Sequence, residues 1–268
     1  MWKWEADRQA KAVIAILHGA YENHRWYAWL IEKLRIEGFH VVMGDLPNHG
    51  TNLQFSRAHD EDFKEYTKYT RQLIENAFSY ELPVFIIGHG LGATLALHIM
   101  QKRKYECAGL ILSSPWLQLK LQPGKLPNAL TTLSALTANV KMTHEIDVSK
   151  LTRSMEGKEE MKDDIPYITV VSVKWYRELQ MMMKNLIAIP KGDFPNRPML
   201  VMTGEKDGIS DVKMARFWLY QQELTEIQYK EWPKCYHNLF HEIEREEIFI
   251  YMRDFINNVL RSVGYIIQ

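Results

Sequence analysis

Runs of apolar residues alternate with amphipathic stretches along most of the chain. Apolar runs at residues 12–17, 83–87 and 108–112 are typical of strands that a sheet buries on both faces. Over residues 25–37 and 60–80, apolar side chains recur every three or four positions, which predicts helices with one buried face. Strands that alternate with helices in this way predict an α/β fold with a mostly parallel central sheet and helices on both faces.

The alternation stops near residue 116 and resumes near residue 196. Strand and helix patterns then follow at residues 198–204, 211–223, 227–232 and 245–260. We therefore predict a core formed by residues 1–115 and 196–268, with residues 116–195 inserted as a helical cap.

The predicted cap is polar and helical in pattern and contains many methionines. Helical patterns lie at residues 131–137, 149–158 and 173–186, and residues 181–183 are three methionines in a row. Methionine side chains adapt their shape, so a surface lined by them would suit a flexible apolar ligand. Ordinary packing between helices explains any single one of these methionines equally well.

A glycine-rich turn follows the apolar run at residues 83–87. Gly88, Gly90 and Gly92 occupy alternate positions there, and glycine permits a turn in which larger side chains would collide. Such spacing between a strand and a helix is typical of a nucleophile elbow, whose middle position normally carries serine. The middle position here is Gly90, so the frame of a catalytic turn lacks the atom that would react.

Polar residues follow several of the predicted strands. His18 comes after the first buried strand, and Asp207 and His237 come after two late strands. Because the carboxyl ends of parallel strands meet at one edge of a sheet, we expect these side chains to lie near the elbow. An elbow followed by an acid and then a histidine is the chain order of the catalytic triad in α/β-hydrolases.

Several motifs, in the same order, resemble the monoacylglycerol lipase and lysophospholipase branch of the α/β-hydrolases, especially its bacterial phospholipase-like members. These motifs lie at residues 18–27, 45–47, 88–92, 204–207 and 236–237. The resemblance covers nearly the whole chain. It implies the α/β-hydrolase fold and hydrolysis of a carboxylic ester, such as a monoacylglycerol or lysophospholipid, with no metal or organic cofactor.

The resemblance also implies a role for each site residue. His237 would be the general base, Asp207 the acid that orients it, and the backbone N–H groups of Ala20 and Leu91 the oxyanion hole. These roles are chemically coherent, because a histidine can take a proton from a nucleophile while an aspartate fixes its tautomer. Gly90 stands at the nucleophile position, where serine is expected.

Gly90 is the departure with the largest consequence, because this mechanism needs a hydroxyl there. Loss of the nucleophile typically lowers turnover about a millionfold. Two explanations stay open: a serine was replaced in an otherwise active hydrolase, or a natural hydrolase-like scaffold has lost acyl transfer. In the second case the chain would bind a lipid-like or small apolar ligand, and the missing side chain would leave room at the elbow for a carboxylate or an ester.

Other histidines and a cysteine near these motifs have simpler structural explanations. We expect His18 and His89 to be packed side chains that satisfy hydrogen bonds. His237 and His241 are four residues apart, but the wider set of ligands that a metal site needs is missing. Cys235 lies on the same loop as His237 and would not reach the expected oxyanion hole, so we do not expect a substitute nucleophile.

Composition restricts the possible binding partners and the cellular compartment but indicates no reaction. The 268 residues are 46% hydrophobic with a formal net charge of zero, which gives no basic face for nucleic acid. Two cysteines, Cys107 and Cys235, fit a reducing compartment, and no apolar run approaches the length of a membrane span. We therefore expect a cytoplasmic protein with a small-molecule ester or lipid-like ligand, of an oligomeric state that the sequence leaves open.

Overall fold

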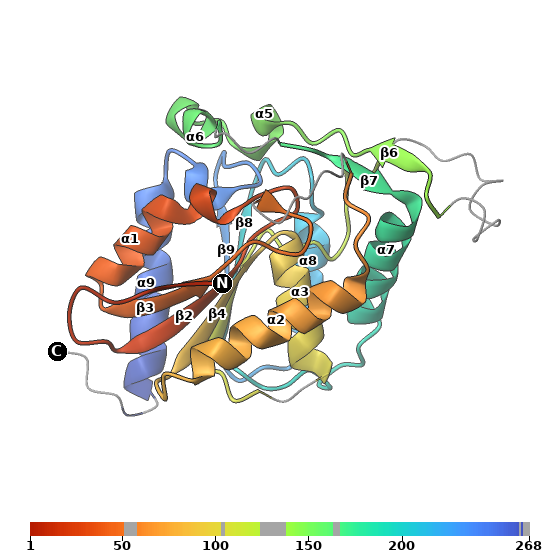
Figure 1. The fold of residues 1–268 in the computed structure, drawn as a ribbon. Helices are drawn as coiled ribbons and strands as arrows, with labels where there is room; N and C mark the ends of the chain where they lie inside the picture. Colours follow the sequence, from red (N-terminus) through yellow and green to blue (C-terminus); the bar gives the residue numbers. More distant parts are fainter. Residues whose placement is uncertain (51–57, 103–104, 124–137, 163–166, 263, 265–268) are drawn as a thin grey trace.

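A seven-stranded sheet forms the centre of the molecule (Figure 1). The computed structural model describes residues 1–50, 58–102, 105–123, 138–162, 167–262 and 264. In spatial order the strands are β1 (Trp2–Trp4), β3 (Phe39–Met43), β2 (Ala12–Leu17), β4 (Val84–His89), β5 (Gly109–Ser113), β8 (Met199–Gly204) and β9 (Ile227–Trp232). All neighbouring strands pair in parallel except β1, which runs antiparallel to β3. The predicted fold class is confirmed.

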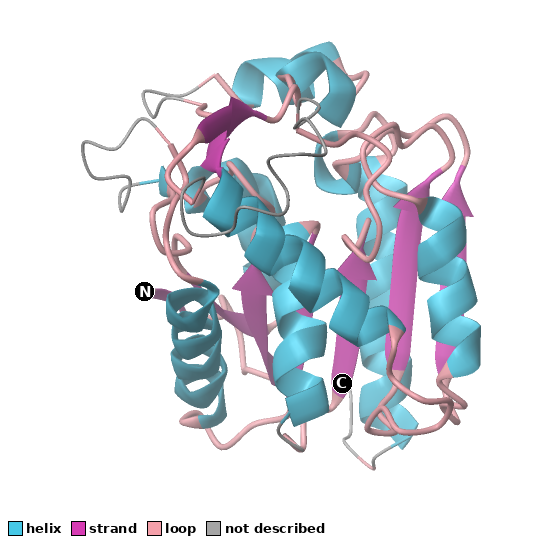
Figure 2. Cartoon of the chain, turned by 90° about the vertical axis from the view of Figure 1, so that its right-hand side faces the viewer, coloured by secondary structure: helices cyan, strands magenta, loops and turns pink. Residues whose placement is uncertain are grey.

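Helices cover both faces of this sheet, because each has one apolar face to bury. Figure 1 shows α1 (Ala28–Ile36) and α9 (Arg245–Ser262) on one side, and α2 (Phe63–Phe78), α3 (Leu91–Lys102) and α8 (Val212–Gln221) on the other. The arrows of the parallel strands in Figure 2 point toward the same edge of the sheet. Loops that follow the strands therefore gather at that edge.

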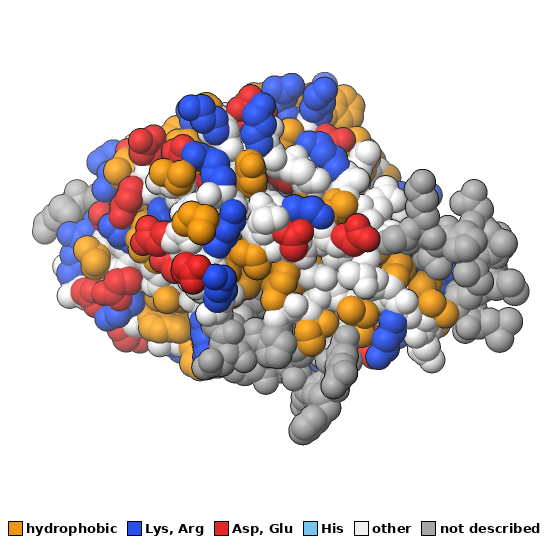
Figure 3. Space-filling view, turned by 90° about the horizontal axis from the view of Figure 1, so that it is seen from above, with side chains coloured by type: hydrophobic (Ala, Val, Ile, Leu, Met, Phe, Trp, Pro, Cys, Tyr) orange, Lys and Arg blue, Asp and Glu red, His pale blue; other side chains and the backbone are white. Residues whose placement is uncertain are grey.

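The segment between β5 and β8 lies over that edge (Figure 1). Its described elements are β6 (Lys141–Thr143), α5 (Val148–Leu151), α6 (Met155–Glu160), β7 (Val170–Ser172) and α7 (Val173–Ile187). Strands β6 and β7 pair antiparallel in a separate two-stranded sheet. Seen from above in Figure 3, the described part of this face carries basic, acidic and apolar side chains side by side.

One expectation for this segment changes. The single helix predicted at residues 149–158 is wrong: α5 and α6 are separate, because Thr152 adopts an extended conformation and Ser154 caps a new helix by accepting a hydrogen bond from Gly157 N–H. The helical pattern at residues 131–137 lies outside the described residues. Within the described residues, no helix combines the length and the apolar character needed to cross a bilayer.

Candidate active site

The glycine-rich turn lies between β4 and α3, as its pattern predicts. A Cβ at Gly88 would approach the backbone of Ala93 to 2.5 Å, and a Cβ at Gly92 would lie 2.1 Å from the carbonyl oxygen of Leu17. Gly90 has a φ of +51°, in the left-handed region that side chains rarely adopt. The turn is therefore as cramped as a nucleophile elbow requires, with Gly90 at its apex.

Asp207 and His237 meet beside this turn. They follow β8 and β9, and the Nδ1 atom of His237 lies 2.9 Å from Oδ2 of Asp207. Both side chains are buried, with 2% of each residue exposed. The loop of His237 is also fixed from β5, because the hydroxyl of Ser114 donates to the carbonyl oxygen of His237 at 2.7 Å.

Asp207 is held in its charged form. Burial alone would raise its pKa, but His237 and the hydrogen bonds from Ser210 and Ile209 lower the pKa to about 2. Its Oδ1 atom accepts from the backbone N–H groups of Ile209 and Ser210 at 2.8 and 3.0 Å, and Oδ2 accepts from the Ser210 hydroxyl at 2.5 Å. The carboxylate therefore has a fixed direction toward the imidazole.

A tryptophan defines the tautomer of His237. The indole Nε1–H of Trp116 donates to Nε2 of His237 at 3.1 Å. An indole nitrogen can only donate, so Nε2 carries no proton and Nδ1–H donates to Asp207. This is the arrangement in which a histidine can accept a proton from a nucleophile.

Gly90 lies directly below this imidazole. A Cβ at Gly90 would be 3.4 Å from Nε2 of His237 and 3.3 Å from Nε1 of Trp116. The indole of Trp116 therefore lies against position 90 and narrows the room that the missing side chain would leave at the elbow. No role for Trp116 was predicted from the sequence, although it lies three residues after the end of β5, the strand that neighbours β4.

The two expected oxyanion-hole residues flank the turn. Ala20 follows β2 and Leu91 opens α3, and both residues are buried. Within the described part of the chain, neither backbone N–H donates a hydrogen bond to another group. Buried amides are normally bonded, so two free ones beside Gly90 suit the binding of an oxygen with developing negative charge.

Glu22 holds the loop after β2 in place, a role the sequence reading missed. Its Oε2 atom accepts from Gly19 N–H at 2.8 Å and from the hydroxyl of Tyr27 at 2.6 Å, and Oε1 accepts from the amide of Asn238 at 2.9 Å. Burial would raise the pKa of Glu22, but His89, whose Nε2 lies 3.4 Å from Oε1, and the Tyr27 hydroxyl lower it to about 2. A buried carboxylate with several donors thus fixes the backbone beside Ala20.

The neighbouring histidines are packed side chains, as expected. Nε2 of His18 accepts from Leu46 N–H at 2.8 Å, which ties the loops after β2 and β3 together. His89 is fully buried, with its Nδ1 atom 3.2 Å from the hydroxyl oxygen of Ser113. Neither side chain occupies the space above Gly90.

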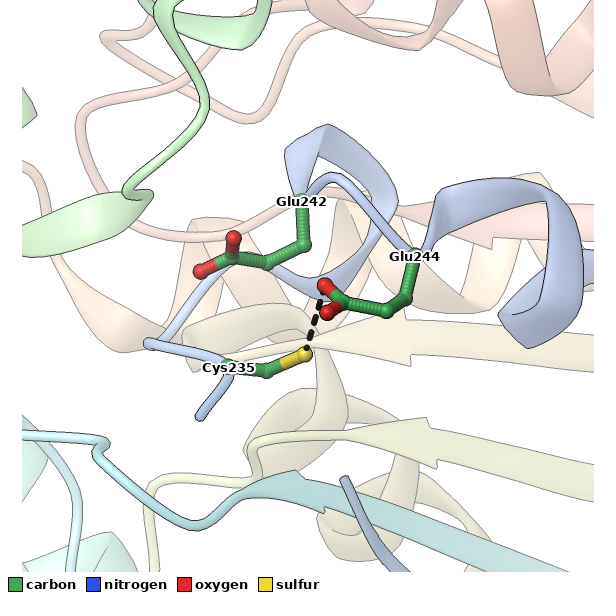
Figure 4. Close-up of side chains that lie close together, drawn as sticks. All are labelled: Cys235, Glu242 and Glu244. Carbon is green, nitrogen blue, oxygen red and sulfur yellow. Dashed lines mark hydrogen bonds between the residues drawn. The ribbon is translucent and has the colours of Figure 1, made fainter. Parts of the chain in front are cut away.

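Cys235, Glu242 and Glu244 come together near the His237 loop (Figure 4). The thiol of Cys235 donates to Oε2 of Glu244 at 3.4 Å, and burial among these acids raises the pKa of that thiol to about 12. Arg153 pairs with both glutamates. Because the guanidinium of Arg153 already balances the negative charge of these carboxylates, the cluster does not need a metal cation. The Cys235 thiol stays protonated and is therefore a poor nucleophile.

A mostly apolar pocket begins at Leu117, the residue that follows Trp116 in the chain. Its volume is about 420 Å³, and it lies between the residues after Trp116 and helix α7. Apolar side chains that line it include Leu117, Leu119, Tyr176, Met183 and Ile187. A pocket of this size and character can hold a hydrocarbon chain.

Comparison with known proteins gives the family. The sequence family described as "Serine aminopeptidase, S33" matches residues 8–244. Phospholipase YtpA of Bacillus subtilis (strain 168) is 37% identical over 262 residues, which cover 97% of this chain and 100% of that protein. Monoglyceride lipase of Homo sapiens is 26% identical over 265 residues, covering 90% of this chain and 83% of that protein.

Solved structures share the fold at lower identity. The monoacylglycerol lipase of Paleococcus ferrophilus superposes with a TM-score of 0.80 and 20% identity, covering 96% of this chain and 98% of that chain. A soluble variant of monoglyceride lipase from Saccharomyces cerevisiae gives 0.82 and 17%, covering 96% and 90%. The chain therefore belongs to the serine aminopeptidase S33 family of α/β-hydrolases, in the branch that contains monoacylglycerol lipases and lysophospholipases.

Proposed function

We propose that the chain carries the frame of a carboxylic ester hydrolase for monoacylglycerol- or lysophospholipid-like substrates, and that it is inactive as it stands because position 90 has no hydroxyl. One observation carries the proposal: a Cβ at Gly90 would point to within 3.4 Å of Nε2 of His237, whose Nδ1 is bonded to Asp207. Residues 116–195 would act as the cap over this site, and the two free, buried cysteines suit a cytoplasmic setting.

A hydroxyl at position 90 would complete the chemistry. Its oxygen would attack the ester carbonyl carbon while its proton moves to Nε2 of His237, and the carbonyl oxygen would become an oxyanion near the amides of Ala20 and Leu91. Collapse of this intermediate would break the bond to the alcohol, which leaves with the proton from His237. Water would then release the acid by the same two steps, and the nucleophile would regain its proton.

The substrate class rests on the apolar pocket and the relatives. The pocket beside Trp116 offers about 420 Å³ for a hydrocarbon chain. Of the proteins compared, one relative is named a phospholipase and several are named monoglyceride lipases. Phospholipids and monoglycerides both contain fatty-acyl esters, which supports an apolar acyl group on the substrate of this chain.

The first prediction is that Gly90→Ser creates esterase activity. We expect turnover of p-nitrophenyl esters and of a monoacylglycerol or lysophospholipid by the variant, measured against the unaltered chain. Adding Asp207→Asn should lower that turnover by a factor on the order of 10³ to 10⁴, because the amide no longer fixes the tautomer of His237. A folded Gly90→Ser variant without activity on any of these esters would contradict the proposal.

A second candidate is a non-catalytic protein that binds a lipid-like ligand. It is favoured by Trp116, whose indole occupies the space above Gly90 and bonds to His237, so that the site is internally satisfied without a nucleophile. Calorimetry of the unaltered chain with a fatty acid and a monoacylglycerol tests it. Saturable binding without hydrolysis supports this candidate, and no binding across the panel argues against it.

A further inference from the structure

Trp116 is anchored to the elbow through its backbone as well as its ring. Its N–H donates to the carbonyl oxygen of Gly90 at 3.2 Å, and the hydroxyl of Thr94 donates to the carbonyl oxygen of Trp116 at 2.7 Å. The residue is 2% exposed. The backbone N–H and C=O groups of Trp116 are thus bonded to the turn and to α3, which leaves little freedom for the indole above Gly90.

The indole takes the hydrogen-bonding position that a serine hydroxyl would need. A serine at position 90 would have to donate to Nε2 of His237, and that atom already accepts from Trp116 at 3.1 Å. Its Cβ would lie only 3.3 Å from the indole nitrogen, closer than side chains usually pack, even before the hydroxyl oxygen is placed. The hydroxyl and the indole therefore compete for one space and one acceptor.

The same ring packs against His144, and the ring of His144 in turn lies near a residue of the apolar pocket. Its centroid lies 5.8 Å from that of His144, and the ring of His144 lies 6.5 Å from that of Tyr176, which lines the pocket. His144 is itself fixed, because its Nδ1 atom lies 2.8 Å from the hydroxyl oxygen of Tyr21.

We propose that Trp116 is a built-in plug of the active site: its indole replaces the nucleophile as the partner of His237 and occupies the space beside position 90 that a serine hydroxyl would need. The inference rests on the proposed function. It predicts that a serine at position 90 is held back by Trp116, and that full reactivity needs both positions to change.

The test compares the rate at which a fluorophosphonate labels Gly90→Ser and Gly90→Ser/Trp116→Phe. In this reaction the serine oxygen bonds to phosphorus, the P–F bond breaks, fluoride leaves and the serine proton passes to His237. Phenylalanine keeps an apolar ring but removes the indole N–H and the ring edge nearest position 90. We expect labelling of the double variant to be at least ten times faster.

Trp218→Phe in the Gly90→Ser background is the matched control. Trp218 is also buried, at 1% exposure, and its indole N–H donates to the carbonyl oxygen of Leu186 at 2.9 Å, in a bond that involves no site residue. This control should label at the rate of Gly90→Ser alone. Equal rates for all three proteins would overturn the plug and leave the proposed function standing, whereas no labelling of any folded variant would overturn both.

A second measurement uses the unaltered chain and needs no activity. The indole N–H resonance of Trp116 should move upfield in a ¹H–¹⁵N spectrum when His237→Leu removes its acceptor, while the resonance of Trp218 stays in place. An unmoved Trp116 resonance would show that the indole does not bond to His237, and the plug would be wrong.

Discussion

At position 90 the backbone itself favours the residue that is present. A φ of +51° costs a side chain roughly 1 kcal/mol or more, and glycine avoids that cost. In an active hydrolase of this fold the strained residue is the nucleophile, so strain is accepted for reactivity. Glycine in this chain relieves the strain, and Trp116 takes over the bond to His237. The local structure is therefore stable without the hydroxyl that the mechanism needs.

A second residue-scale prediction concerns Glu22. We expect Glu22→Gln to lower the free energy of unfolding by about 2–4 kcal/mol. The carboxylate accepts hydrogen bonds from donors such as Gly19 N–H and the Tyr27 hydroxyl, and the NH2 group of the glutamine would face a donor instead of accepting from it. Urea unfolding measures this change. The matched control is Glu32→Gln, whose exposed carboxylate pairs with Arg35 at the surface and should matter by less than about 1 kcal/mol. Equal effects of the two substitutions would contradict the role of Glu22.

At the scale of elements, burial decides what the sequence predicts. Strands β2 and β9 begin and end at the predicted residues, and α7 extends one residue past its predicted end. Strand β2 is a continuous buried apolar run and α7 has a regular apolar face, which makes both easy to place from the sequence. Strands β1, β6 and β7 went unpredicted. Each has only three residues, and β1 and β6 are largely exposed, so no apolar run or alternation marks them.

The site shows the same division between local and distant causes. Gly88 and Gly92 are predictable, because a Cβ at either position would lie within 3 Å of neighbouring backbone atoms, so only glycine fits. Asp207 and His237 follow strands in an order that a parallel sheet brings to one edge. The contact of Trp116 with His237 depends on how a loop folds back across that edge, and the burial of Glu22 depends on groups 216 residues away in the chain. No local pattern encodes either.

The elbow itself gives a prediction about an element junction. Gly92→Ala should destabilise the chain by about 3 kcal/mol or more, because a Cβ would lie 2.1 and 2.5 Å from the carbonyl oxygens of Leu17 and His18, which belong to rigid backbone. Gly208→Ala is the control, since a Cβ there meets nothing within 4 Å. Thermal unfolding compares the two variants. A Gly92→Ala protein as stable as Gly208→Ala would mean that β2 and α3 are not packed this closely.

At the scale of the whole molecule, the described part of residues 116–195 is held to the rest of the chain by polar contacts. His59 N–H donates to the carbonyl oxygen of Val170 at 2.7 Å, and His144 lies against Tyr21. Lys174 pairs with Asp62. These contacts join β7, α7 and the segment after β6 to the core.

Acid should therefore weaken the fold. Burial lowers the pKa values of His59, His144 and His241 to about 4, below the value near 6.5 expected in the unfolded chain. Below pH 6.5 the unfolded state therefore binds more protons than the folded state. The free energy of unfolding keeps its highest value above pH 6.5 and falls as the pH drops toward 4, by at most about 2–3 kcal/mol per histidine. The lowered carboxyl pKa values of Glu22 and Asp207 extend the loss below pH 4.5.

Urea unfolding at pH 7.0, 5.5 and 4.5 measures this dependence. We expect the midpoint to fall steadily across the series, and His241→Gln to flatten the slope, because it removes one of the buried titrating groups. A midpoint that stays constant from pH 7.0 to 4.5 would show that these histidines do not titrate with unfolding.

In the proposed function, Gly90 marks the nucleophile position of an otherwise complete hydrolase site. The most direct measurement is intact-mass spectrometry of the Gly90→Ser variant after exposure to a fluorophosphonate, followed by peptide mapping. The account predicts one adduct per chain, on the peptide that contains position 90, and none on the unaltered chain. A folded variant that gains no adduct, or gains it elsewhere, would contradict the account.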